Sequence, residues 1–129
     1  MSGTPQEQAR RLLSLLFPND VAESIYREFG DIVAVARAQL SPDLVNRQVA
    51  AMDAWHRIGI GNRLGQMNVP VLIASGTADI VVIPPSNALK LVNAIPGAWL
   101  AQFNGGGHAF MAQYPLPLAD LVNSFLALR

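Results

Sequence analysis

The chain has 129 residues, the length of one ordinary domain, and 51% of them are apolar, which is enough to form a hydrophobic core. Nine Lys and Arg balance nine Asp and Glu, so the net charge gives no reason to expect binding to nucleic acid or to an anionic membrane surface. Charged residues make up only 14% of the chain and the mean hydropathy is +0.29, so we expect an apolar surface that a partner covers.

The sequence contains no cysteine, which excludes disulfides, a thiolate nucleophile and a Cys-ligated metal, and fits a reducing compartment. The first eight residues are polar, and no apolar run approaches the roughly 18 residues that span a bilayer. We therefore expect a cytoplasmic protein without a membrane partner. Two histidines at these spacings do not make a metal site, so no metal and no cofactor is expected.

Residues 1–63 are expected to form a helical layer, because apolar side chains recur there at steps of three and four from Gln6 onward. The tripeptide at 41–43, SPD, combines an N-cap, a proline at the first helical position and an early acid. A helix should therefore begin near Pro42. Two glycines that follow predict its end near Arg57.

Residues 64–129 have a different pattern, in which short apolar runs alternate with helical spacing. Strands are expected at 71–75 and 99–103, and their unbroken apolar character is typical of strands covered on both faces. Helices are expected near 87–93 and 118–128. The order strand, helix, strand, helix predicts an α/β fold with two parallel strands joined by a right-handed crossover, and ligands bind at the carboxyl ends of such strands.

Asp79 and His108 each follow the carboxyl end of an expected strand. A histidine can take the proton of a nucleophile, and a carboxylate on its other ring nitrogen fixes the tautomer and stabilises the imidazolium. The glycines at 105–107 allow the sharp turn that would bring the His108 ring back over the strand end. The alternative is that Asp79 is a turn or capping residue and that the glycine loop is merely flexible.

Several stretches resemble the C-terminal part of the α/β-hydrolase family: VLIASGTADIVV at 71–82, PPSNA at 84–88, IPGAWL at 95–100, GGHAF at 106–110 and QYP at 113–115. The likeness covers about residues 64–129, and the helices before it resemble, more loosely, the lid or cap that the family inserts ahead of this region. The resemblance implies that Asp79 is the acid and His108 the base of a Ser-His-Asp triad. Ile83 departs from the family pattern, in which proline follows the two valines directly.

The sequence contains no G-x-S-x-G pentapeptide, the elbow that carries the family's nucleophile between a strand and a helix. The stretch GNRLG at 61–65 has the glycine spacing, but its centre, Arg63, cannot act as a nucleophile. The earlier strands of the family are absent as well. We therefore expect a partial α/β-hydrolase fold whose nucleophile for ester-type hydrolysis comes from outside this chain, from a longer polypeptide or from a separate N-terminal half.

Two other residues have simpler interpretations. His56 lies on the helix after Pro42 and is expected to be a surface or packing histidine rather than a substrate contact. Ser75 lies in or at the end of a buried strand, where a hydroxyl bonded to the backbone is more common than a substitute nucleophile.

A different class of function is also open, in which the chain is a catalytically inactive module that folds as a homodimer or larger assembly and acts in binding. Two parallel strands leave two unpaired edges, and such edges tend to pair with another chain. The sequence thus predicts an interface above roughly 1,000 Å². The catalytic interpretation predicts a small-molecule substrate and an Asp79 carboxylate oxygen within about 2.6–3.2 Å of a His108 ring nitrogen.

Overall fold

The computed structural model describes residues 3–83 and 86–128. The first half contains α1 (Pro5–Leu16), α2 (Asn19–Ala38), α3 (Pro42–Ile58) and the short 3₁₀ helix η1 (Gly61–Gln66). The second half contains β1 (Leu72–Gly76), α4 (Ser86–Ala94), β2 (Trp99–Phe103), α5 (Phe110–Gln113) and α6 (Pro115–Ala127). None of the helices in these described ranges is both long enough and apolar enough to cross a bilayer.

The ends of the first helices follow from their capping residues. Thr4 and Glu7 form a reciprocal capping box at the start of α1, which satisfies two backbone N–H groups that the helix itself cannot bond. The Ser41 hydroxyl accepts a hydrogen bond from the Leu44 N–H at 3.1 Å at the start of α3. Gly59 ends α3 with a φ of +62°. The predicted start at Pro42 is thus confirmed, and the helix ends one residue beyond the expected Arg57.

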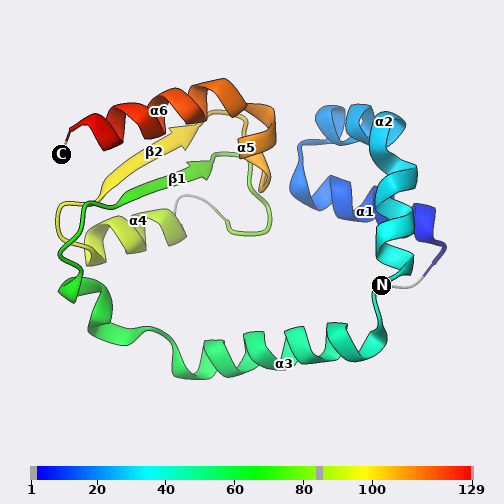
Figure 1. Ribbon diagram of the computed structural model, residues 1–129, viewed down its shortest axis with the longest axis horizontal. Helices are drawn as coiled ribbons and strands as arrows, with labels where there is room; N and C mark the ends of the chain where they lie inside the picture. Colours follow the sequence, from blue (N-terminus) through cyan, green and yellow to red (C-terminus); the bar gives the residue numbers. More distant parts are fainter. Residues whose placement is uncertain (1–2, 84–85, 129) are drawn as a thin grey trace.

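The sheet consists of β1 and β2, which pair in parallel with Leu72 opposite Trp99 and Gly76 opposite Phe103. Helix α4 connects the two strands and covers one face of the sheet, while α6 lies along the other face (Figure 1). The Phe125 ring of α6 meets the Trp99 ring edge to face, with 5.8 Å between ring centroids. The predicted parallel pair joined by a helix is confirmed.

The expectation that both strands are covered on both faces is wrong for this chain. The first four residues of β1 are only half-buried, and Trp99 at the start of β2 is 50% exposed. The reason is the width of the sheet, since one helix lies on each face and each described strand has one edge without a partner strand. Helices η1 and α5 were not predicted from the sequence, and α6 begins three residues before the expected position.

Helices α1 and α2 lie side by side as a hairpin next to the sheet (Figure 1). Their buried cluster consists of Leu13, Phe17 and Ala22. Ala109, from the loop after β2, packs against this cluster. The helical hairpin therefore contacts the very loop that carries His108.

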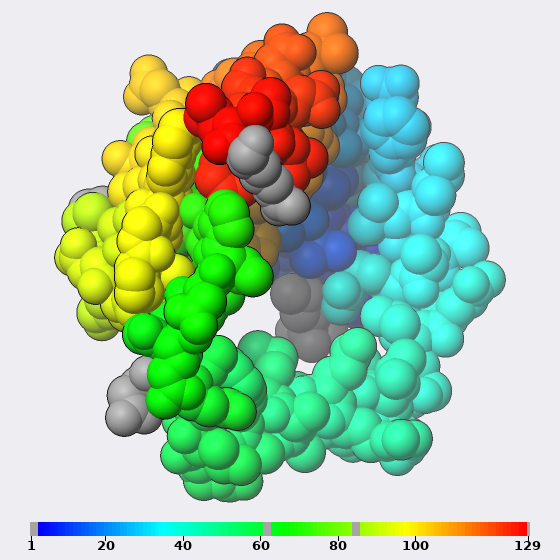
Figure 2. Space-filling model, turned by 60° about the vertical axis from the view of Figure 1, so that its left-hand side comes forward, coloured from blue at the N-terminus to red at the C-terminus, as the bar shows by residue number. Residues whose placement is uncertain are grey.

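Helix α3, all of whose residues the structure describes, contributes no buried residue. It runs as an arm from the end of α2 to the start of the sheet region, and Figure 2 shows an opening between this arm and the other elements. Its exposed apolar side chains include Val49, Met52, Trp55 and Ile58, which are 51–80% exposed. Large apolar side chains in such a position are typical of a surface that another element or chain covers.

Candidate active site

The chain turns directly after β1 and thereby places Asp79 beyond the end of the strand. The Thr77 N–H donates to the Phe103 carbonyl at 3.0 Å, and the Ala78 N–H donates to the Gly106 carbonyl at 2.8 Å. Both bonds continue the pairing of β1 with the neighbouring segment past the last strand residues. Asp79 is consequently held close to the loop that follows β2.

The loop after β2 is fixed by hydrogen bonds to three other segments. The Gly105 N–H donates to the Thr77 hydroxyl at 2.8 Å, and Gly105 has a φ of +73°, a conformation that favours glycine. The Gly107 N–H donates to the Gln113 side-chain oxygen at 2.7 Å, and the Ala109 N–H donates to the Leu16 carbonyl at 2.8 Å. The residue before His108 and the residue after it are therefore each held by a hydrogen bond that their backbone N–H donates.

Two glycines of this region also permit close backbone contacts. A Cβ atom on Gly76 would collide with the Gly106 carbonyl, and one on Gly107 would lie 2.6 Å from the Leu16 carbonyl oxygen. The strand end, the glycine loop and the end of α1 can approach this closely only without side chains at Gly76 and Gly107. The glycine loop is thus tightly packed, which contradicts its interpretation as a merely flexible segment.

The Asp79 Oδ2 atom lies 3.0 Å from the His108 Nδ1 atom. This confirms the predicted hydrogen-bond distance between the two side chains. The other carboxylate oxygen, Oδ1, accepts hydrogen bonds from the N–H groups of Val81 at 2.8 Å and Val82 at 2.9 Å. Asp79 therefore closes the turn after β1 as well as contacting the histidine, so the predicted turn role and the pairing coexist.

Burial and hydrogen bonding act on Asp79 in opposite directions. Burial by itself raises the pKa of the carboxyl, because it disfavours the charged form. Hydrogen bonds from the Val82 N–H, the His108 ring and the Val81 N–H outweigh this effect, and the net result is a pKa below the ordinary value. Asp79 is therefore ionised at neutral pH, with a side chain that is 9% exposed, whereas the His108 side chain is 38% exposed.

A cavity of about 270 Å³ lies beside the pair, between β1, α4 and the His108 loop. Its walls include both Asp79 and His108, together with the apolar side chains of Leu91 and Met111. Ser75 lines the same cavity, and its Oγ atom is buried without a hydrogen-bond partner among the residues that the structure describes. The expected bond from the Ser75 hydroxyl to the backbone is therefore wrong within the part of the chain that the structure describes.

The other residues considered from the sequence lie elsewhere. His56 is exposed on α3, and its Nδ1 atom lies 2.9 Å from the Met52 carbonyl oxygen, as expected of a surface histidine. The GNRLG stretch lies within the 3₁₀ helix η1 rather than at a turn between a strand and a helix, so it does not form an elbow. In the described part of the chain, no group of three His, Asp or Glu side chains is close enough to hold a metal ion.

Three residues that position the site were not singled out from the sequence. Thr77 bonds the glycine loop, Gln113 bonds the N–H group beside His108, and Leu16 supplies the carbonyl that holds the loop from α1. Gln113 carries a signal, since it opens the QYP stretch that contributes to the family resemblance. The hydrogen bond to the Leu16 carbonyl has no such signal in the sequence, because every residue has a backbone carbonyl.

No protein-family model matches the chain, whereas comparisons with curated proteins and with solved structures give partial matches. The chain is 26% identical over 129 residues to a curated protein named "Putative carbamate hydrolase RutD" from Pseudomonas syringae pv. syringae (strain B728a), and the match covers 98% of this chain and 48% of that protein. Among solved structures it is similar to Est816, described as an N-acyl homoserine lactone degrading enzyme, with a TM-score of 0.65 and 26% identity over 93% of this chain and 47% of that one.

The chain thus spans about half the length of the relatives that it matches. Both likenesses extend over nearly all of this chain, the helical first half included. They support a hydrolase-like fold with a mixed arrangement of helices and two parallel strands.

Proposed function

We propose that this chain is the C-terminal portion of a serine-type α/β-hydrolase and supplies the acid, Asp79, and the base, His108, of a catalytic triad. In this proposal residues 1–63 are the lid or cap, and residues 64–129 are the segment that carries the pair. The observation that carries the proposal is the 3.0 Å contact between Asp79 Oδ2 and His108 Nδ1 beyond the ends of two parallel strands. The nucleophile comes from a polypeptide segment that carries an elbow motif, in a longer chain or in a separate N-terminal half.

The tautomer of His108 follows from the state of its partner. An ionised carboxylate can only accept hydrogen bonds, so the Nδ1 atom of His108 carries the hydrogen that lies toward Asp79. The Nε2 atom then has its lone pair free, which is the state of a general base. Because Asp79 is buried and His108 is more exposed, the carboxylate is shielded from water while the ring remains accessible.

The proposed reaction is acyl transfer in two steps. His108 Nε2 takes the proton of the incoming serine hydroxyl as the serine oxygen bonds to the substrate carbonyl carbon, and then gives that proton to the leaving group as its bond to carbon breaks. In the second step His108 Nε2 takes a proton from water as the water oxygen bonds to the acyl carbon, and then gives that proton to the serine oxygen as its bond to the acyl carbon breaks. Asp79 keeps its charge throughout and stabilises the imidazolium formed in each step.

The matched relatives support a substrate with a carbonyl carbon bonded to oxygen or nitrogen. A carbamate and an N-acyl homoserine lactone both contain such a bond, and each is named for one of the relatives. We propose the same broad class, a small ester-type substrate, for the complete enzyme of which this chain is a part. The apolar walls around the 270 Å³ cavity are compatible with a small organic molecule.

The proposal is tested by assaying the isolated 129 residues with nitrophenyl esters and by labelling them with a fluorophosphonate, which reacts with activated serines. We expect no turnover above that of the His108→Ala variant and no labelling, because the chain contains the base but lacks an elbow serine. Turnover that is lost in His108→Ala, together with labelling of a serine in this chain, contradicts the claim that the nucleophile comes from elsewhere.

A second candidate function, an inactive module that associates with a second copy of itself, is favoured by the exposed apolar side chains of α3 and the open sheet edges. In this alternative Asp79 closes the turn after β1, and its contact with His108 has only a structural role. The two candidates differ in what covers the sheet edge, namely a hydrolase half that carries an elbow or an identical chain. Co-purification of the chain with an elbow-bearing polypeptide favours the first candidate, and a stable homodimer that excludes such a polypeptide favours the second.

A further inference from the structure

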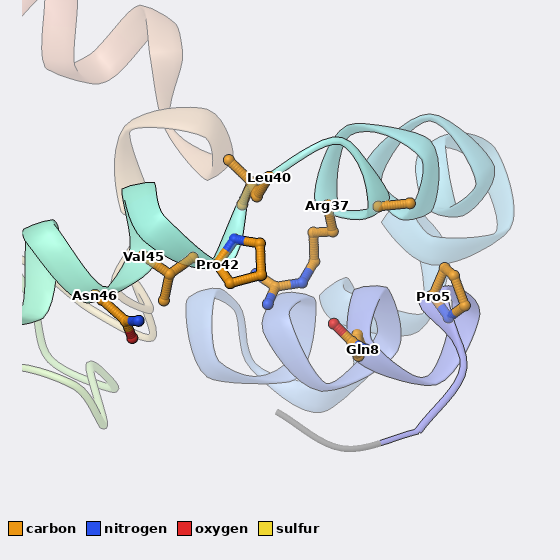
Figure 3. A pocket seen from close by; sticks show the side chains of 8 residues that line it. Pro5, Gln8, Arg37, Leu40, Pro42, Val45 and Asn46 are labelled. Carbon is orange, nitrogen blue, oxygen red and sulfur yellow. The ribbon is translucent and has the colours of Figure 1, made fainter.

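A second cavity, of about 410 Å³, lies among the helices of the first half of the chain. It shares none of its described lining residues with the cavity beside Asp79 and His108. Its walls come from α1, the end of α2 and the start of α3, and its polar side chains are Gln8, Arg37 and Asn46 (Figure 3). The size is in the range of small-molecule sites, so the chemistry of the walls determines what could bind there.

Arg37 is the charged residue of this cavity, and its guanidinium has no partner among the described residues. The Nε atom is buried and makes no hydrogen bond to residues 3–83 or 86–128. The side chain extends from α2 across the space between α1 and the start of α3 (Figure 3). Asp43 in the first turn of α3 lies 4.0 Å from Arg47 in an exposed pair, and no carboxylate lines the cavity within the described residues. Because the Nε atom is closed off from the cavity, an anion there would pair with the terminal N–H groups of the guanidinium, for which the described residues provide no acceptor.

The neighbours of Arg37 restrict the kind of anion. The Gln8 Nε2 atom donates to the Gly3 carbonyl at 2.9 Å, so one of the two N–H groups of this amide is already engaged. Asn46 adds an exposed side-chain amide at the rim. A single guanidinium with two side-chain amides matches a singly charged carboxylate, whereas a phosphate dianion is ordinarily bound by several cations or by a row of backbone N–H groups.

The remaining walls are apolar and include Leu40, Pro42 and Val45. They would cover a short hydrocarbon chain attached to the carboxylate, which adds the burial of apolar surface to the charge-assisted hydrogen bonds from Arg37. A ligand with an anionic head and a short aliphatic tail therefore complements both parts of the cavity.

We propose that this cavity is a binding site for a small aliphatic carboxylate, with Arg37 as the residue that binds the carboxylate group. The site is separate from the proposed catalytic pair and does not depend on the chain being part of a hydrolase. Its ligand bridges the helical hairpin and the start of α3, so binding would fix this end of the α3 arm against α1 and α2.

The test is isothermal titration calorimetry of the full 129-residue chain with hexanoate and with hexanamide, its uncharged counterpart, at low ionic strength. We expect hexanoate to bind at least about tenfold more tightly than hexanamide, since only the anion pairs with the guanidinium. Arg37→Met should weaken hexanoate binding about tenfold or more and leave hexanamide binding unchanged. Arg27→Met is the matched control, because Arg27 lies exposed on the same helix and outside this cavity.

Nuclear magnetic resonance of the native chain tests the same site without the Arg37→Met variant, in case that variant does not fold. Hexanoate should shift the backbone amide resonances of residues around Arg37 and Asn46 more than those around His108. Equal affinity for hexanoate and hexanamide overturns the proposal. Three other results also overturn it: no hexanoate binding at millimolar concentration, unchanged hexanoate binding in Arg37→Met, or resonance shifts in residues away from this cavity.

Discussion

The substitution Asp79→Asn should reverse the tautomer of His108. The oxygen of the asparagine amide is the group that can still accept from the Val81 and Val82 N–H groups, which lie 2.8 and 2.9 Å from Oδ1 in the native protein. The amide nitrogen must then occupy the place of Oδ2 and donate toward His108 Nδ1. The ring can accept this bond only if its own hydrogen moves to Nε2. The variant histidine would then no longer present a lone pair at Nε2.

The expected loss of stability is moderate, because two of the three hydrogen bonds survive. Asparagine keeps the bonds from Val81 and Val82 but replaces the charge-assisted bond to His108 by a neutral one, which costs about 1–2 kcal/mol in the free energy of unfolding. The substitution Asp79→Ala removes all three bonds and should cost about 1–2 kcal/mol more. The variant Asp79→Asn should therefore stay folded, so its tautomer can be measured.

The assay is long-range ¹H–¹⁵N correlation spectroscopy of the histidine rings at a pH where they are neutral. In the native protein His108 should carry its hydrogen on Nδ1, and in Asp79→Asn it should carry it on Nε2. His56 is the internal reference, because its Nδ1 atom lies 2.9 Å from the Met52 carbonyl and should keep its hydrogen in both proteins. A His108 ring whose tautomer is the same with Asp or Asn at position 79 refutes the reasoning.

Three further predictions follow from the site and from the α3 arm. Because the pKa of Asp79 is lowered in the folded state, its ionisation stabilises the fold above about pH 4, and this contribution should decline as the pH falls below the ordinary aspartate value of about 3.9. Denaturant unfolding should therefore show that the difference in free energy of unfolding between the native chain and Asp79→Asn becomes smaller on acidification. A difference that does not change with pH would contradict the assignment. Gly107→Ala should lower the free energy of unfolding by about 1–3 kcal/mol, because its Cβ would lie 2.6 Å from the Leu16 carbonyl oxygen. Gly65→Ala is the control, since the nearest atom to its Cβ would be 3.8 Å away. In the same unfolding experiment its free energy of unfolding should differ from that of the native chain by less than about 0.5 kcal/mol. Static light scattering at micromolar concentration should show a homodimer or larger assembly that Met52→Glu on α3 weakens, and a monomeric native chain would exclude self-association through this arm.

The order of elements and the Asp79–His108 contact could be predicted because they depend on local signals. The SPD tripeptide and the glycine after α3 define that helix through capping and backbone conformation, which neighbouring residues alone determine. The two short apolar runs and the helix between them predict a parallel pair. Once that pair exists, residues that follow the two strand ends must lie close together, and this places Asp79 beside His108.

The features that could not be predicted depend on contacts between distant segments. The sequence predicts more burial of β1 and β2 than the structure shows. Apolar strands tend to be buried, but their sequence does not indicate whether the same chain contains the elements that would bury them. The bond from the Ala109 N–H to the Leu16 carbonyl, which docks the helical hairpin on the His108 loop, involves backbone atoms alone and leaves no pattern in the sequence. The Arg37 cavity likewise forms only when three helix ends meet.

The central claim, that Asp79 and His108 are a functional acid and base awaiting a nucleophile, is tested most directly by a chimera. The part of the Pseudomonas syringae relative that this chain does not match is joined to these 129 residues, and a chimera shown to be folded by circular dichroism is assayed with nitrophenyl esters. We expect turnover that falls by about three orders of magnitude or more in His108→Ala, while His56→Ala, the matched control, retains activity. A folded chimera whose turnover is the same with and without His108 would contradict the account.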